Sequence, residues 1–87
     1  MKNEPASLAD ASLCRRLRLR WRDPNDVRAE VTDLGVAIYW RAEYLGTWRA
    51  IDRHYEFRPV DDTTNGVVAH TILGAVAFTE GIIQSRT

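Results

Sequence analysis

The stretch "VAIYWRAEYLGTWRAIDRHYEF", residues 36–57, carries the strongest structural signal in the chain. It contains three runs in which large apolar residues take every second position, a pattern typical of β-strands because successive side chains point to opposite faces of a sheet. Turns separate the runs at residues 41–43 and at residues 52–53. The sequence therefore predicts an antiparallel meander over residues 34–60.

The two predicted turns bring apolar side chains to one face of this meander. The first turn places Trp40 opposite Tyr44. Further along the same strands Val36 lies opposite Trp48, and the second turn places Trp48 beside Phe57. Because two turns with no shared residues agree, we expect this face to be the core. The predicted core face consists of Val36, Ile38, Trp40, Tyr44, Trp48, Ala50, Tyr55 and Phe57.

Before the meander, the stretch "CRRLRLRWR", residues 14–22, contains five arginines separated by leucine or tryptophan. As a helix, it would leave Leu19 among the arginines. As a strand, it places Leu17, Leu19 and Trp21 on one face and arginines on the other. The strand accounts for every residue, so the pattern predicts a strand with a solvated basic face.

The residues around this stretch extend the prediction to a hairpin. The "DPND" turn that follows it favours pairing of residues 16–22 with residues 27–33. Before it, the segment "SLADASLCRR" has a weak capping box formed by Ser7 and Asp10. Whether this segment is a short helix or joins the first strand stays open at this point.

The C-terminal part of the chain has helical spacing. Apolar residues recur every three or four positions over residues 66–84, and Thr64 or Asn65 is a suitable N-cap. We therefore predict an α+β fold: a mainly antiparallel sheet of up to five strands, covered on one face by the long C-terminal helix, with a short N-terminal helix as an option. Residues 1–87 are expected to form one domain, and residues 1–6 to be disordered.

The C-terminal helix has more apolar residues than one face of a small sheet can cover. A chain of 87 residues has a marginal core, which a second subunit would supplement. We therefore expect a homodimer or another protein partner on this helix, and a non-enzymatic interaction module such as an adaptor or inhibitor. The candidate interface residues are Val67, Phe78, Ile82 and Ile83.

The alternative function is nucleic-acid binding by the arginine-rich stretch. Its candidate contacts are Arg16, Arg18, Arg20, Arg22 and Arg28. The chain has 12 basic and 12 acidic residues, so a basic surface would require segregated charges, and acids crowd this hairpin. The order of helix, sheet and closing helix resembles that of double-stranded-RNA-binding domains. The lysine-rich start of their second helix is absent, since residues 65–70 read "NGVVAH".

Residues able to carry out chemistry are few. Cys14, His54 and His70 fall in three different elements and in no known motif, so we expect no enzyme, no cofactor and no metal site. A single cysteine excludes an intramolecular disulfide and is typical of a cytoplasmic protein. The apolar C-terminal segment is interrupted by polar residues and is short for a bilayer span, so no membrane partner is expected.

Overall fold

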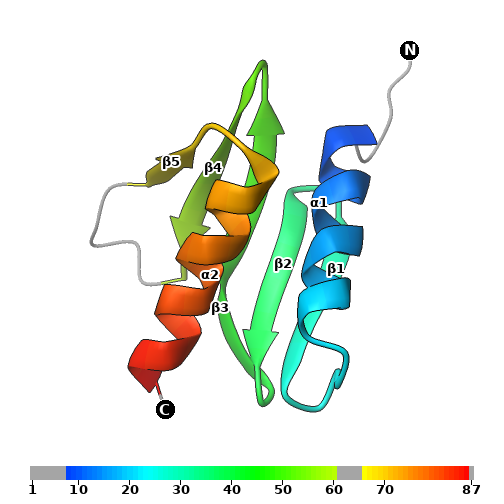
Figure 1. Ribbon diagram of the computed structural model, residues 1–87, viewed down its shortest axis with the longest axis vertical. Coiled ribbons are helices and arrows are strands. Elements are labelled where there is room, and N and C mark those ends of the chain that lie inside the picture. The colour runs from blue at the N-terminus through cyan, green and yellow to red at the C-terminus, as the bar shows by residue number, and fades with distance from the viewer. Residues whose placement is uncertain (1–7, 61–65, 87) are drawn as a thin grey trace.

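The computed structural model describes residues 8–60 and 66–86, and it confirms the α+β class (Figure 1). The predicted disorder of residues 1–6 lies outside the described residues. In the described part of the chain, neither helix is long and apolar enough to span a lipid bilayer. The elements, in chain order, are α1 (Leu8–Arg20), β1 (Val27–Thr32), β2 (Gly35–Trp40), β3 (Glu43–Ile51), β4 (His54–Pro59), β5 (Val67–Ala69) and α2 (Ile72–Arg86).

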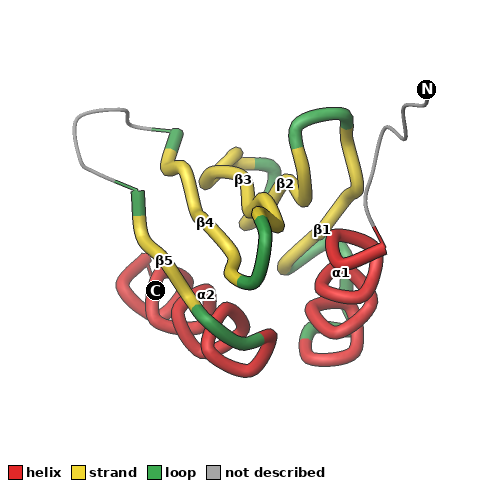
Figure 2. Tube along the Cα trace, turned by 90° about the horizontal axis from the view of Figure 1, so that it is seen from above, coloured by secondary structure: helices red, strands yellow, loops and turns green. Residues whose placement is uncertain are grey.

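The five strands form one antiparallel sheet in the order β1-β2-β3-β4-β5. Both helices lie on the same face of this sheet, as the view from above shows (Figure 2). The predicted sheet with its covering C-terminal helix is thus confirmed. No described element lies on the opposite face, which we call the open face.

The predicted register of the meander is confirmed over most of its length. Val36 pairs with Trp48 across β2 and β3, and Trp48 pairs with Phe57 across β3 and β4. Trp48 is fully buried, and its indole N–H donates to Thr79 Oγ1 of α2 at 2.9 Å. This hydrogen bond satisfies a polar group in the centre of the core and joins the sheet to the helix above it.

The predicted pair of Trp40 and Tyr44 is wrong. Arg41 and Ala42 have φ values of 49° and 75°, so they form a two-residue turn, and Trp40 pairs with Glu43 instead. The register then shifts by one residue between Ile38 and Tyr39, at a β-bulge that restores the predicted pairing beyond it. As a result Tyr44 pairs with Tyr39 on the open face rather than in the core.

The predicted hairpin of residues 16–22 with residues 27–33 is also wrong, because α1 continues to Arg20. The backbone of β1 pairs with β2, so β1 does not require a pairing strand from residues 16–22. Its apolar face, however, must be buried against another element. The helix supplies that cover by burying Asp10, Leu13, Cys14 and Leu17 at helical spacing. Leu19 is left 59 % exposed. This exposure of an apolar side chain is the reason that the sequence pattern favoured a strand.

The predicted helix over residues 66–84 begins too early. Its first residues form β5, in which Val67 pairs with Phe57, and α2 starts only at Ile72. The cap is Thr71, whose Oγ1 accepts a hydrogen bond from the Gly74 N–H at 2.9 Å. The predicted caps Thr64 and Asn65 lie outside the described residues.

Candidate functional site

The helix α1 separates the arginines that the strand prediction had grouped together. Arg16 is exposed on the outer side of the helix. Arg18 Nε donates to the Ala29 carbonyl of β1 at 3.0 Å, which caps the free edge of the sheet. Arg20 forms an ion pair with Glu80 of α2. Two of the candidate nucleic-acid contacts are therefore engaged within the fold.

The other two candidates, Arg22 and Arg28, line a hollow beside β1 together with Arg18. Arg22 is exposed in the loop after α1. Arg28 forms an ion pair with Glu30 at 2.9 Å, and its guanidinium lies 4.2 Å from the centroid of the Tyr39 ring. Because Tyr39 faces away from the helices, Arg28 belongs to the open face. Arg18, Arg22 and Arg28 nevertheless line one hollow, together with Trp21 and the carboxylate of Glu30, while Arg16 and Arg20 do not line it.

The four candidate interface residues are mostly packed against the sheet. Phe78 contacts the rings of Trp48 and Phe57, with centroids 5.9 and 5.8 Å away. Ile83 is buried, while Val67 and Ile82 are half-buried beside the core. The outward side of α2 presents a different residue, Leu73, which is 67 % exposed.

The candidate reactive side chains do not form a centre. The Cys14 thiol is buried and lies 3.5 Å from the Ala29 carbonyl, and this burial raises its pKa. The rings of His54 and His70 lie 6.4 Å apart at the ends of β4 and β5. Among residues 8–60 and 66–86, no group of three or more side chains is placed to hold a metal ion.

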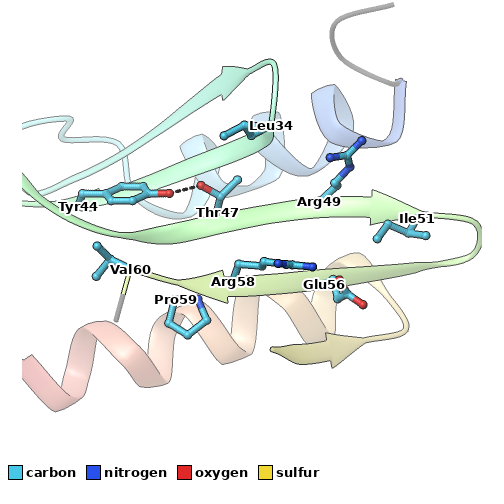
Figure 3. Close-up of a pocket in the computed structure, with 9 residues that line it drawn as sticks. All are labelled: Leu34, Tyr44, Thr47, Arg49, Ile51, Glu56, Arg58, Pro59 and Val60. Carbon is cyan, nitrogen blue, oxygen red and sulfur yellow. Dashed lines mark hydrogen bonds between the residues drawn. The ribbon is translucent and has the colours of Figure 1, made fainter. Parts of the chain in front are cut away.

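A groove of about 740 Å³ crosses the open face (Figure 3). Its floor comes from alternate residues of β3 and β4, and its rim comes from the turn between β1 and β2 and from the end of β4. These side chains point to the open face because the alternate residues of each strand face the helices. The lining residues are Leu34, Tyr44, Thr47, Arg49, Ile51, Glu56, Arg58, Pro59 and Val60.

Two arginines of this groove have no ion-pair partner among the described residues, Arg49 of β3 and Arg58 of β4. By contrast, Glu56 is the one carboxylate among the described lining residues; it pairs in register with Arg49 but forms no ion pair with it. The described residues of the groove therefore present two exposed positive charges and one negative charge. Within the described residues, the arginines that do form ion pairs are Arg20, Arg28, Arg41 and Arg86.

The rest of the groove is largely apolar. Leu34 is 67 % exposed and Val60 is 50 % exposed, and both are aliphatic side chains at the rim. Tyr44 closes one end, where its hydroxyl forms a hydrogen bond with Thr47 (Figure 3). The groove therefore combines exposed aliphatic side chains with two guanidinium groups that have no ion-pair partner in the described part of the chain.

Sequence reasoning did not identify this groove. Arg49, Glu56 and Arg58 are outward residues of the predicted meander, which by itself indicates only a solvated face. Tyr44 was predicted in the core, and the bulge moves it to the groove. The sequence did contain one indication that a face of the sheet is uncovered: it predicts no second helix long enough to cover the other side of five strands.

Comparison with known proteins does not assign the chain to a family or a function. No protein-family model, no curated protein and no solved structure matches the chain. The function is therefore inferred from the groove and from the charges around it.

Proposed function

We propose that this protein is a small non-enzymatic protein-interaction module that binds its partner on the open face of the sheet. The observation that carries the proposal is the groove, in which Arg49 and Arg58 lack ion-pair partners among the described residues and lie beside exposed aliphatic side chains. In a protein–protein interface, buried apolar area contributes to the affinity. An arginine that the partner encloses often contributes a large share of the binding free energy.

The charges on the open face favour a protein over a nucleic acid. A nucleic-acid surface combines several unpaired basic groups with aromatic rings that are free to stack on bases. Here Arg28 already covers one side of the Tyr39 ring, and Tyr39 also contacts Tyr44. Two carboxylates also lie on this face: Glu30 forms an ion pair with Arg28, and Glu56 lines the groove. Nucleic-acid binding is therefore the second candidate and an outcome of the tests below.

The proposal is tested by affinity capture from cells that produce the protein, followed by mass spectrometry. The bait is compared with Arg49→Glu plus Arg58→Glu and with Arg15→Glu plus Arg16→Glu. The first pair changes the groove and the second makes the same change of charge on the exposed side of α1. We expect the wild type and the α1 variant to capture the same protein, and the groove variant to lose it.

Two results would contradict the proposal. One is capture that the α1 variant loses and the groove variant keeps, which would move the binding surface to α1. The other is capture that nuclease treatment abolishes in all baits, which would favour nucleic acid as the ligand. Circular dichroism spectra of all three baits serve as the control that each variant is folded.

A further inference from the structure

The geometry points to a particular kind of partner: an extended acidic segment of a protein, in which two carboxylates at positions i and i+2 contact Arg49 and Arg58. This inference rests on the proposed function and names its ligand. It follows from the spacing of the two arginines, from the aliphatic residues on either side of them, and from the charge in the groove.

The spacing comes from the register of β3 and β4. Arg49 pairs with Glu56, and Thr47 pairs with Arg58, so the two arginines are diagonal neighbours on adjacent strands. Diagonal neighbours on one face of an antiparallel pair are about 7–8 Å apart. Side chains two residues apart in an extended chain point the same way and are about 6.6–6.8 Å apart. An extended segment therefore brings alternate side chains close to both guanidinium groups.

Aliphatic residues extend this line at both ends. Ile51 lies two residues beyond Arg49 on the same face of β3, and Val60 lies two residues beyond Arg58. The position of Val60 is set by its N–H, which donates to the Leu45 carbonyl at 3.0 Å. The four side chains thus follow one another along the groove at steps of two residues. The complementary segment has the pattern apolar-x-acidic-x-acidic-x-apolar and spans about 20 Å.

Carboxylates suit this site better than the phosphates of a nucleic acid. The planar guanidinium group accepts either anion in a bidentate contact. The flanking Ile51 and Val60, however, offer apolar contacts that aliphatic side chains use and that phosphodiester groups do not. Glu56 also limits the net positive charge of the groove. A short acidic and aliphatic segment matches each of these features.

The test uses a seven-residue probe peptide with leucine at its first and last positions, glutamate at the third and fifth, and serine between. The full-length protein is titrated with the peptide up to millimolar concentration while its amide NMR signals are recorded. We expect saturable shifts at Ile51, Arg49, Arg58 and Val60. A peptide of the same composition with adjacent glutamates, and one with lysine in place of glutamate, are the controls.

Variants of the groove extend the test. Arg49→Gln with Arg58→Gln should weaken binding of the probe about tenfold, because two charge-assisted contacts of surface strength are lost. Glu56→Gln should tighten binding, because it removes a carboxylate of the groove that repels the probe. None of these three side chains is buried, so both variants are expected to keep the wild-type fold, with amide signals changed only near the substitutions in the absence of peptide.

The inference is wrong if the probe causes no shifts in the groove at millimolar concentration, or if either control peptide binds equally well. It is also wrong if a thymidine oligonucleotide causes the groove shifts and displaces the probe. If the probe fails while the groove variant still loses its partner in affinity capture, the ligand assignment fails and the proposed function stands.

Discussion

At the scale of single residues, Cys14 shows how a side chain is used for packing rather than for chemistry. Its thiol is buried between α1 and β1, and desolvation raises its pKa above the ordinary value of 9.0, although Arg18 acts in the opposite direction. A thiol that is protonated and enclosed is a weak nucleophile. The cysteine therefore contributes to the core in the same way as Leu13 and Leu17 beside it.

This environment predicts a dependence of stability on pH. The folded protein holds the Cys14 proton more tightly than the unfolded chain, so the contribution is fully present below pH 9.0 and is lost as the pH rises through the folded-state pKa. Above pH 9.0 the free energy of unfolding of the wild type should fall, relative to that of Cys14→Ala, by up to about 1.4 kcal/mol per pH unit. Urea unfolding of both proteins from pH 7 to pH 10.5 measures this difference, and a constant difference would contradict it.

At the scale of the elements, the bulge in β3 depends on Gly46. Its φ of 152° is unfavourable for other residues, and an added Cβ would lie 2.5 Å from the Arg58 carbonyl and from the Phe57 ring. Backbone and a core ring cannot both move away without breaking the pairing of β3 and β4. The bulge in turn places Tyr44 at the end of the groove, so this glycine also supports the proposed binding surface.

We expect Gly46→Ala to destabilise the protein by at least about 3 kcal/mol, through overpacking together with backbone strain. Gly81 of α2 is the matched control, because an added Cβ there meets nothing within 4 Å. Gly81→Ala should stabilise the protein by about 0.5–1 kcal/mol, since alanine loses less entropy in a helix. Thermal and urea unfolding measure both changes, and equal effects of the two substitutions would contradict the role given to Gly46.

At the scale of the whole molecule, both helices lie on one face of the sheet and leave two surfaces exposed. One is the open face with its groove. The other is the outer side of the helices, where α2 exposes Leu73 beside the small residues Ala77 and Gly81. Self-association through α2 stays a prediction, and the structure indicates which residue should test it. Phe78 is unsuitable because it packs on Trp48 and Phe57, so its substitution would report on folding.

If the protein is a homodimer through α2, Leu73→Asp should shift it to a monomer, because a buried charge without a partner disfavours the interface. Sedimentation velocity over a range of protein concentrations measures this shift. Leu19→Asp is the control, since Leu19 is also exposed but lies on α1. A wild type that stays monomeric at high concentration would exclude the homodimer, and a shift caused by both variants would exclude α2 as its specific site.

The sequence by itself determined the meander of β2, β3 and β4 and the covering C-terminal helix. Strand alternation and turn positions are local properties, and the pairs of Val36 with Trp48 and of Trp48 with Phe57 followed from them. The one error within the meander, at Trp40 and Tyr44, arose because a shorter turn and a bulge offset each other. From Ile38 and Gly46 onward, the pairing is the same with the longer predicted turn as with the observed turn and bulge. The pattern of apolar residues therefore does not distinguish the two.

Only the tertiary structure decided the state of the arginine-rich stretch and the position of the groove. The alternating leucines and arginines favoured a strand. The stretch is helical instead because β1 pairs with β2 and leaves its core face for α1 to cover. The groove, likewise, needs Leu34 and Val60 to lie beside Arg49 and Arg58, although two turns of the chain separate Leu34 from Val60. Such contacts join residues distant in sequence, so their energies depend on the packed sheet and not on the local pattern.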